Sequence, residues 1–407
     1  SLTPGSPAKV VRRAPFATPW RTIQIADRAG GLVESNLILN LNEPNKLGDV
    51  SWFKPSKYVG VWWAMHLDQQ TWGTGPKHGA TTANTRRYID FAAKYGFRGV
   101  LVEGWNTGWD GDWFANGWAF DFRKPTADYD LPGLAAYAKA KGVHLIGHHE
   151  TACAVSHYER QMDEAFALFE TLGIDSVKTG YVCDAGQIER QDVEGGPVIR
   201  EWHESQFMSN HHLRVLLAAA KHHIAIDAHE PIKDTGLRRT YPNWVSREGA
   251  RGQEFNAWGN PPNPPEHETN LVFTRMLAGP MDYTPGVLSL EGRNQPIRST
   301  IARQLAELFE AKFDPARDQH ALNLDIASKA LKPMLDGVAS LDELIAQTVP
   351  ASIRMLNDGS ASSVNSSTSV DLVRSYVRTG GGVPVSPAYE MRHSRPRVLS
   401  RPGCLRS

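Results

Sequence analysis

Between Tyr58 and about Phe309, short apolar segments alternate with amphipathic stretches of helical periodicity. This alternation is typical of parallel strands joined by helices. The predicted strands are Val59–Met65, Gly99–Gly104, Val143–Gly147, Asp175–Tyr181, Ile224–Ala228, a short Trp244–Arg247 and Pro280–Tyr283. The predicted helices are Thr82–Tyr95, Leu131–Lys141, about Ser156 to Leu172, Glu201–His222 and about Arg298 to Phe309. Seven such units in about 250 residues favour a TIM-type (β/α)8 barrel over an open sheet.

Polar and ionisable residues follow most of the predicted strands. They are His66 and Asp68, Glu103 and Trp105, His148-His149-Glu150, Lys178, His229-Glu230 and Glu248. In a barrel of parallel strands the active site lies at the carboxyl ends of the strands. In a doubly wound sheet these residues would gather mainly at one switch point. The regular placement therefore predicts an α/β barrel with an enzyme site at its carboxyl end.

The rest of the chain does not follow this pattern. We expect residues 1–55 to be a lead-in from an N-terminal β-sandwich that is missing, and residues 56–312 to form the barrel. Residues 313–407 form a divergent tail, in which 317–349 could hold one or two helices. Residues 357–407 are rich in Ser, Arg, Gly and Pro, a composition that predicts disorder. No convincing eighth strand can be recognised, so the barrel is expected to be incomplete at its last strand.

Composition excludes several classes of partner. Lys+Arg and Asp+Glu both number 44, so the net charge is zero, which gives no electrostatic reason to expect nucleic acid or an anionic membrane as partner. No apolar run reaches the ~18–20 residues that a membrane span needs.

The chain starts Ser-Leu-Thr-Pro-Gly, without an initiator Met or a signal peptide, which predicts a fragment or a mature chain. The three cysteines permit one disulfide at most, and we interpret Cys153 and Cys183 as small buried apolar residues.

Four glutamates lie at or just after strand ends: Glu150, Glu230, Glu248 and Glu254. Cleavage of a glycosidic bond needs two carboxyl groups, one to protonate the leaving oxygen and one to attack the sugar or activate a water. Several ionised carboxylates in one pocket repel one another and require a counter-charge. Calcium prefers oxygen ligands, so we expect a calcium site here. Lys178 and Arg251 are the alternative source of positive charge.

The histidine pairs His148-His149 and His222-His223 raise the alternative of a zinc hydrolase. Neighbouring residues of a strand point to opposite faces, so His148 and His149 cannot both face the interior of a barrel. His222 and His223 precede a strand, at the end of the barrel away from the expected site. We expect His148 and His229 to donate hydrogen bonds to sugar hydroxyls or to orient carboxylates.

Long motifs of this chain resemble those of glycoside hydrolase family 97, bacterial α-glucosidases and α-galactosidases. The matching segments run from Thr18–Arg21 to about Leu305 and include Trp62-Trp63, 147–151, 177–181, 227–231, 236–242, 248–252 and 274–286. The resemblance implies a TIM barrel between an N-terminal β-sandwich and a C-terminal β domain. It also implies that the substrate is an α-linked oligosaccharide and that calcium is the cofactor.

The resemblance also implies roles for single residues. Glu254 matches the general acid, and Glu230 and Glu150 match the two glutamates that activate water in the inverting branch. Glu230, Glu248 and Glu254 match carboxylates around calcium. The residues that match the substrate pocket are Lys178, His148, His229 and Trp63. The family acts outside the bacterial cytoplasm, which implies a periplasmic or otherwise extracytoplasmic location.

One position separates the branches of the family. Retaining members carry an aspartate nucleophile at the end of the fourth strand, where this chain has Gly180. Glycine offers no nucleophile and leaves room for a water, which favours an inverting α-glucosidase. Asp184 is the reserve nucleophile. A retaining α-galactosidase-like enzyme and a truncated, inactive sugar-binding barrel remain the alternatives.

Overall fold

The computed structural model describes residues 3–8, 10–284, 287, 289–301 and 304. Its centre is a six-stranded sheet in the order β1-β2-β5-β6-β9-β10, in which every neighbouring pair is parallel. The strands are β1 Tyr58–Val61, β2 Gly99–Val102, β5 His144–Glu150, β6 Ser176–Gly180, β9 Ala225–Ala228 and β10 Trp244–Arg247. Because spatial order follows chain order, the sheet has the arrangement of six consecutive strands of a barrel.

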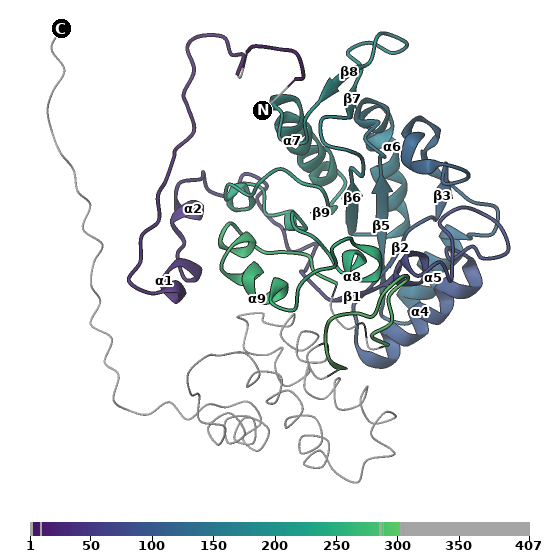
Figure 1. Ribbon diagram of the computed structural model, residues 1–407. Helices are drawn as coiled ribbons and strands as arrows, with labels where there is room; N and C mark the ends of the chain where they lie inside the picture. The colour runs from purple at the N-terminus through teal and green to yellow at the C-terminus, as the bar shows by residue number, and fades with distance from the viewer. Residues whose placement is uncertain (1–2, 9, 285–286, 288, 302–303, 305–407) are drawn as a thin grey trace, which may run out of the picture. The chain divides into compact units, whose positions relative to one another are not determined.

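Four long helices connect the strands and flank the sheet (Figure 1). They are α4 Thr82–Tyr95, α5 Leu131–Ala140, α6 Val155–Leu172 and α7 Gln206–Lys221. Three of them begin with a side chain that accepts a hydrogen bond from the first turn, namely Thr81, Asp130 and Ser205. Helices α4 and α6 end at Gly96 and Gly173, whose φ of 72° is the left-handed conformation that favours glycine.

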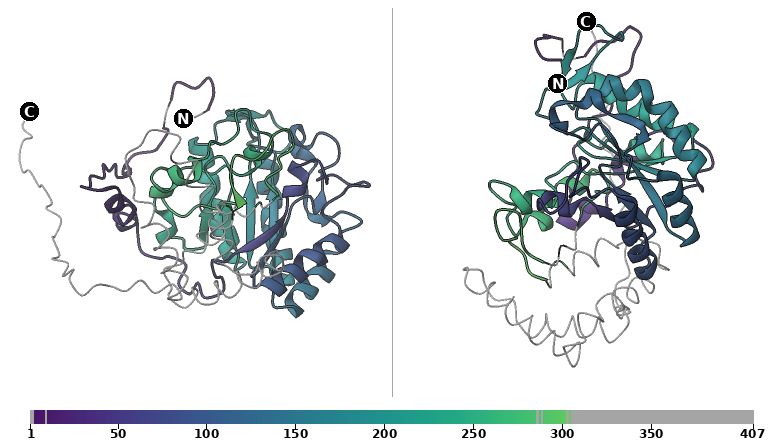
Figure 2. Two further views of the ribbon diagram at one scale, coloured as in Figure 1. Left: turned by 60° about the horizontal axis from the view of Figure 1, so that its bottom comes forward. Right: turned by 90° about the vertical axis from the view of Figure 1, so that its right-hand side faces the viewer.

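The remaining elements are short. They are the helices α1 Ala29–Val33, α2 Leu37–Asn40, α3 Trp63–His66, α8 Glu254–Trp258 and α9 His267–Val272, and the 3-10 turns η1 Trp113–Ala115, η2 Gly117–Ala119, η3 Leu237–Arg239 and η4 Arg275–Leu277. Two antiparallel strand pairs, β3 Asn106–Thr107 with β4 Asp121–Pro125 and β7 Ile188–Arg190 with β8 Ile199–Glu201, lie in the segments that follow β2 and β6 (Figure 2).

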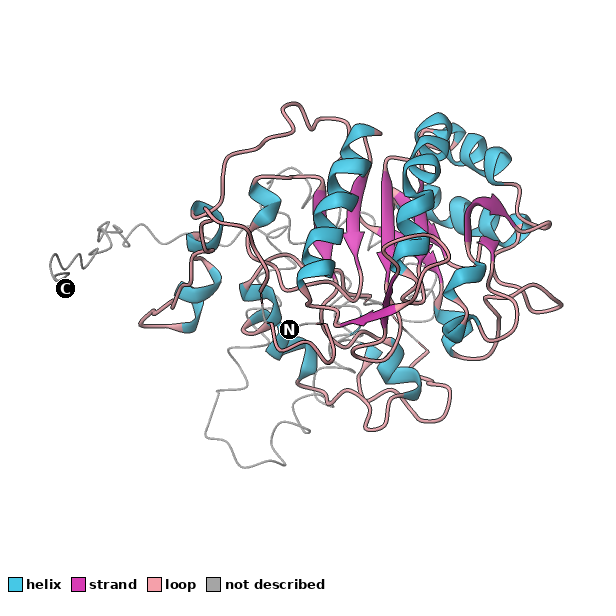
Figure 3. Cartoon of the chain, turned by 90° about the horizontal axis from the view of Figure 1, so that it is seen from above, coloured by secondary structure: helices cyan, strands magenta, loops and turns pink. Residues whose placement is uncertain are grey.

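The sheet curves so that its first strand meets the segment beyond its last one. After β10, the backbone of Met281 forms a parallel bridge with Arg247, and Asp282 N donates to Arg247 O at 2.9 Å. The Tyr58 hydroxyl of β1 then donates to Asp282 Oδ2 at 2.6 Å. Such a contact between the two edges requires the curvature of a barrel wall, and the strands are seen side by side in Figure 3. The described residues thus form a partial (β/α) barrel.

A buried core lies between the sheet and the helices. It contains apolar strand residues such as Val100 and Ile226 together with Leu134, Phe169 and Leu216 from the helices. Among the described residues, no helix is long and apolar enough to cross a membrane.

Most predicted elements are confirmed to within a few residues, and the exceptions have local causes. The predicted strand Val59–Met65 is wrong beyond Val61, because Trp63–His66 form a helical turn that packs on α8. The predicted helix Glu201–His222 begins only at Gln206, since Glu201 ends β8 and Ser205 caps the helix. The seventh strand, Pro280–Tyr283, is reduced to the bridge at Met281. The predicted helix from Arg298 is described only in part, and the predictions for 313–407 lie outside the described residues.

The interpretation of Cys153 and Cys183 as separate small apolar residues is wrong, because they form a disulfide with Cα atoms 5.9 Å apart. The cause lies in the register of the sheet. Glu150 of β5 pairs with Gly180 of β6, and each cysteine follows its strand end by three residues. The two segments that follow β5 and β6 therefore leave the sheet side by side. Cys404 lies outside the described residues.

Candidate active site

The carboxyl ends of the parallel strands bring most of the predicted site residues together. The register pairs His148 with Lys178 and Lys178 with Asp227, so three adjacent strands place them in one row. His148, Lys178 and Glu150 are buried, whereas Glu230, Glu248 and Glu254 are partly exposed. The site is therefore a set of deep residues with a rim of glutamates.

The deepest ion pair joins Lys178 to Glu103. Lys178 Nζ donates to Glu103 Oε1 at 2.8 Å, and Trp72 Nε1 donates to Glu103 Oε2 at 2.8 Å. Burial alone would raise the pKa of Glu103, but the charge of Lys178 lowers it to about 2. Burial likewise opposes the charge on Lys178, and Glu103 more than compensates, so the pKa of Lys178 is raised. Glu103 was not among the predicted site residues, although its place at the end of a strand was the available signal.

His148 faces this ion pair, and its imidazole ring stays neutral. Its Nε2 lies 3.7 Å from Glu103 Oε1, and its ring stacks on Trp109 with centroids 5.8 Å apart. Burial, with a smaller contribution from the charge of Lys178, lowers the pKa of His148 to about 3, against the opposing effect of Glu103. His148 is thus a neutral imidazole that can offer one hydrogen bond.

Glu150 and Glu230 form a pair whose carboxyl groups are held by backbone amides. Ala152 N and Val182 N donate to Glu150 Oε1 at 2.7 and 2.9 Å, and Tyr181 N donates to Glu230 Oε2 at 2.8 Å. Burial, and next the charge of Glu230, raise the pKa of Glu150 to about 8. Glu230 itself has a φ of 44°, a left-handed conformation that is uncommon for a residue with a side chain. Such conformations gather at functional sites.

Glu248 and Glu254 complete the rim. Burial raises the pKa of Glu248 to about 8; the charge of His229 opposes this, and those of Glu230 and Glu254 add to it. Burial also raises the pKa of Glu254, and Glu230 adds to this effect. The four predicted glutamates thus lie close enough to repel one another.

His229 lies between two sets of carboxylates. Its Nε2 donates to Asp282 Oδ2 at 2.7 Å, and its Nδ1 lies 3.4 Å from Glu248 Oε2. Burial and Lys178 oppose its charge, yet Glu248, Asp227 and Asp282 together raise the pKa of His229 well above its usual value. A protonated His229 uses both ring nitrogens on carboxylates, which fits the predicted role of orienting them. Asp227 and Asp282 were missed, although both lie in segments that the resemblance covers.

Trp63 is the first residue of α3. This helix packs against α8, which begins with Glu254, and Trp258 Nε1 of α8 donates to His66 Nδ1 of α3 at 3.0 Å. The indole N–H of Trp63 is buried without a hydrogen-bond partner among the described residues. Trp63 therefore lies on a helix that contacts the helix of the predicted acid, and its indole N–H is a donor without a partner among the described residues.

Gly180 has no room for a side chain. A Cβ added there would lie 2.0 Å from Glu150 Oε2, so the carboxyl group of Glu150 fills the space that an aspartate would need. The reserve residue Asp184 lies on an exposed turn, where its carbonyl accepts from Gln187 N at 3.1 Å.

Two clusters of described residues bring three potential metal-ligating atoms within 4.8 Å of one another, and neither is a set of glutamates. One is Cys153, Cys183 and His203, in which the two cysteine sulfur atoms are bonded to each other as a disulfide. The other is Asp227, His229 and Asp282, in which His229 Nε2 donates to Asp282 Oδ2 at 2.7 Å and lies 3.7 Å from Asp227 Oδ2. Asp227 Oδ1 is buried without a hydrogen-bond partner among the described residues. The predicted ligands Glu230, Glu248 and Glu254 are neighbours, but they are not drawn this close together.

The remaining histidines are accounted for by packing. His149 points away from the site as expected, stacks on Phe169 and accepts a hydrogen bond from or donates one to the Tyr158 hydroxyl at 3.0 Å. His222 lies between α6 and α7 and contacts Asp163 and Glu170. Neither pair of neighbouring histidines forms a zinc site.

A cavity of about 500 Å³ is lined by residues between 65 and 74 and between 109 and 113, and by none of the predicted catalytic, substrate-binding or metal residues. Trp72, whose indole N–H donates to Glu103, forms part of its wall together with Trp109 and Trp113. Asp68 and Asp110 also line it. Aromatic faces next to polar groups are suited to sugar rings, whose two faces are apolar and whose edges carry hydroxyls.

Buried carboxyl groups at the ends of parallel strands, beside aromatic walls, are the arrangement of a barrel-type glycoside hydrolase. Residues 62–250 match the family description Glycoside hydrolase 97, and residues 2–44 match Glycosyl-hydrolase 97 N-terminal. The chain belongs to glycoside hydrolase family 97.

Solved and curated relatives agree with this assignment. A family 97 enzyme from Pseudoalteromonas sp. strain K8, in complex with acarbose, is 62% identical with a TM-score of 0.67, over 70% of this chain and 43% of that chain. A glutamate-to-glutamine variant of that enzyme, in complex with panose, is 61% identical with the same TM-score and coverage. A retaining alpha-galactosidase of Bacteroides thetaiotaomicron is 29% identical over 73% of this chain and 41% of its own length. The chain thus spans less than half the length of these relatives.

Proposed function

We propose that this chain carries the catalytic barrel of a calcium-dependent α-glucosidase that cleaves α-linked oligosaccharides from the non-reducing end with inversion. The observation that carries the proposal is the position of Glu150. Its carboxyl group occupies the space beside Gly180 where a retaining enzyme of this family would hold its nucleophile. Position 180 itself supplies no carboxylate nucleophile, and an inverting enzyme instead uses a carboxyl group that activates a water.

The bound ligands of the relative support the substrate class. Acarbose and panose, both α-linked oligosaccharides, are bound by the Pseudoalteromonas enzyme that is 62% identical to this chain. The retaining alpha-galactosidase is a much more distant relative at 29% identity. We therefore place the substrate among α-glucosides.

The residues fit a calcium ion. Glu230, Glu248 and Glu254 would hold it, because they offer carboxylate oxygens that repel one another, and the pKa of Glu248 is raised to about 8 by burial and by these neighbours, against the charge of His229. Calcium, when bound, supplies positive charge that favours the ionised form of the carboxyl groups and binds sugar oxygens. The trio of Asp227, His229 and Asp282 is a poorer calcium site, since one of its three ligand atoms is a histidine nitrogen, whereas calcium takes oxygen ligands.

The protein residues divide the chemistry between two sides of the sugar. Glu254 donates a proton to the glycosidic oxygen, and burial, which raises its pKa, favours the protonated form that this step needs. On the other side Glu150 and Glu230 accept a proton from the attacking water. The pKa of Glu150, raised to about 8 first by burial, makes its ionised form a strong base for this proton.

Binding groups surround these acids and bases. Lys178 and neutral His148 offer hydrogen bonds deep in the site, His229 orients Glu248, and Trp63 offers its free indole N–H beside α8. We also propose an extracytoplasmic location, which the Cys153–Cys183 disulfide supports because such bonds persist in oxidising compartments.

The proposal is tested by the stereochemistry of the first product. The purified chain is incubated with an aryl α-glucoside and calcium, and proton NMR follows the anomeric signal, with a parallel chelator sample. We expect β-glucose first, and no release in chelator. If α-glucose appears first, the enzyme is a retaining one. If sugar binds in isothermal titration without any release, the chain is a sugar-binding barrel.

A further inference from the structure

We propose that the disulfide between Cys153 and Cys183 positions the carboxyl pair Glu150 and Glu230, so that breaking it slows the chemical step while substrate binding persists. The inference rests on the proposed function, in which this pair accepts the proton of the attacking water. Three observations carry it: where the bond lies, which amides it fixes, and the backbone conformation it holds.

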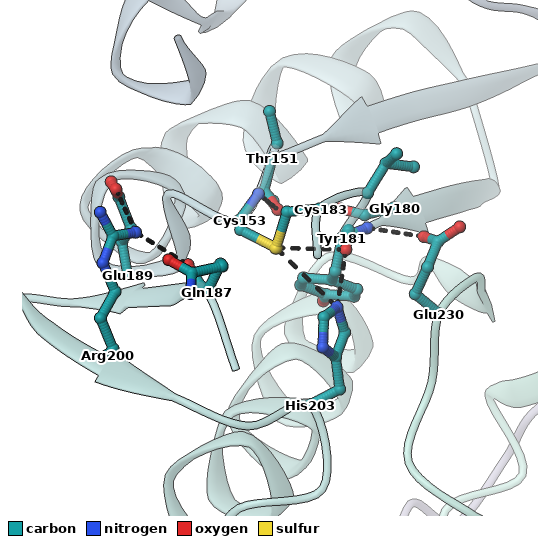
Figure 4. The surroundings of a disulfide bond; sticks show 12 residues. Thr151, Cys153, Gly180, Tyr181, Cys183, Gln187, Glu189, Arg200, His203 and Glu230 are labelled. Atoms are coloured by element: carbon teal, nitrogen blue, oxygen red, sulfur yellow. Dashed lines mark hydrogen bonds and ion pairs between the residues drawn. A yellow bond between two sulfur atoms is a disulfide. The ribbon is translucent and has the colours of Figure 1, made fainter. Parts of the chain in front are cut away.

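The bond joins the two segments that directly follow the ends of β5 and β6 (Figure 4). Both amides that hold Glu150 belong to residues that immediately precede a cysteine. Ala152 N donates at 2.7 Å and Val182 N at 2.9 Å, and both reach the same oxygen, Oε1. One hydrogen bond therefore comes from each side of the disulfide, and separating the segments that follow β5 and β6 would remove at least one of these hydrogen bonds.

The same segment serves the second carboxyl group. Tyr181 N donates to Glu230 Oε2 at 2.8 Å, next to Val182 N, which donates to Glu150 (Figure 4). Two consecutive amides thus fix the spacing of Glu150 and Glu230. The carbonyl of Tyr181 accepts from His203 Nε2 at 2.9 Å, which adds a second support to this segment.

The backbone around Cys153 is in a conformation that needs external support. Ala152 and Cys153 have φ values of 38° and 64°, two successive left-handed residues that both carry side chains. Residues with a Cβ adopt this region only when their surroundings hold them in it. The disulfide holds Cys153, and Glu189 N donates to its carbonyl at 2.8 Å. This conformation turns Ala152 N–H back toward Glu150.

The fold does not depend on the bond alone. Thr151 N and Thr151 Oγ1 donate to Gly180 O at 3.0 and 2.9 Å, so β5 and β6 stay joined without it. We therefore expect a local displacement of the two carboxyl groups. Because a misplacement of about 1 Å at reacting groups can cost roughly 100-fold in rate, kcat should fall by about ten- to 100-fold with KM within about twofold.

The experiment compares the full chain with C153A/C183A, with C404S as the matched cysteine control. Activity is measured on an aryl α-glucoside with and without azide. Azide attacks the anomeric carbon as the bond to the aryloxide breaks, and it has no proton to give up, so it does not need the base. We expect the double variant to lose kcat and azide to restore turnover as glycosyl azide, while C404S behaves like the parent chain.

Hydrogen exchange gives a readout that does not require activity. We expect amides in segments 150–155 and 180–183 to exchange at least about tenfold faster in C153A/C183A, with the rest of the sheet unchanged. If the double variant does not fold, the folded parent is reduced with a phosphine and measured in the same way. Unchanged exchange in these segments, or a lost kcat that azide does not restore, overturns the positioning role. An α-anomer as first product from the parent chain instead contradicts the proposed function and leaves the exchange result to decide this inference.

Discussion

Glu103 and the two glutamates Glu150 and Glu248 lie at the carboxyl end of one sheet, and their pKa values are shifted in opposite directions. Glu103 has Lys178 at 2.8 Å, which overcomes the effect of burial and lowers its pKa to about 2. Burial is the main cause that raises the pKa of Glu150 and of Glu248 to about 8. The charge of Glu230 adds to this effect at both residues, and the charge of His229 opposes it at Glu248. Similar burial thus has opposite consequences, depending on whether a cation is built in.

The difference separates a permanent part of the site from a responsive part. The Glu103–Lys178 pair is neutralised by the protein itself, so it serves as a fixed support and binding surface. Buried Glu150 and the rim of Glu230, Glu248 and Glu254 are short of positive charge, which suits groups that must hold a proton, pass it on or bind a cation.

The largest effect is expected from the proton donor of the rim. Glu254→Gln should lower kcat on unactivated α-glucosides by about 100- to 10,000-fold, because general acid catalysis contributes that much. Aryl glycosides with good leaving groups should lose far less, since their leaving group needs little proton assistance. The matched control is E266Q, at an exposed glutamate that directly precedes α9, which should keep parental rates. Equal losses on both classes of substrate would remove Glu254 from the acid role.

The fixed pair should fail through stability. Lys178→Met leaves the buried carboxylate of Glu103 without its partner, which should lower the free energy of unfolding by about 3–5 kcal/mol. The double variant K178M/E103Q should recover much of this loss, because no buried charge is left unpaired. K221M removes an exposed ion pair to Asp163 and should change stability by less than about 1 kcal/mol. Urea denaturation measures all three, and a K178M loss no larger than that of K221M would contradict the account.

A smaller effect is expected where Glu150 meets Gly180. In Gly180→Ala the added Cβ would lie 2.0 Å from Glu150 Oε2, the free end of a flexible side chain, so the carboxyl group must move; we expect little loss of stability but a fall in kcat. G60A is the control, since a Cβ on that strand glycine would meet nothing closer than 3.7 Å. Kinetics and thermal melts of the two variants settle this, and parental kcat in G180A would show that Glu150 is not confined.

The smallest expected effect is a pH-dependent shift in melting temperature. The folded-state pKa of Glu248 is raised from 4.5 to about 8, so the stability linked to its proton is fully present below about pH 4.5 and is lost as the pH rises through about 8. Calcium should offset this loss, so its stabilisation should grow by a few degrees from pH 6 to pH 8. Differential scanning calorimetry with calcium and with chelator measures it; a calcium shift that shrinks with rising pH would contradict the sign.

Much of this fold could be predicted from sequence because the strands are bounded by clear signals. Trp244–Arg247 and Thr82–Tyr95 were predicted with the observed bounds, and the opposite directions of His148 and His149 followed from the alternation of a strand. The helical turn at Trp63 was missed, because an apolar run does not reveal whether it pairs with a strand or packs on a helix.

The site was predicted in its residue types but not in its pairing. Glutamates after strands indicate a carboxylate-rich site, yet nothing local shows that Lys178 pairs with Glu103 rather than with the rim. Asp282 was missed as a site residue because its partners Tyr58 and His229 are distant in sequence. The Cys153–Cys183 bond depends on the register of β5 and β6, which only the assembled sheet defines.

The most direct test of the contrast between the two regions is isothermal titration of calcium into the chain at pH 7, in two buffers of different ionisation enthalpy. Ion binding to protonated carboxyl groups must release protons, so the measured heat depends on the buffer. We predict that the parent chain and E266Q bind calcium with release of about one proton per ion. We predict that E248Q loses this binding. Binding without proton release, or equal binding in E248Q, would contradict the claim that the rim glutamates hold the cation.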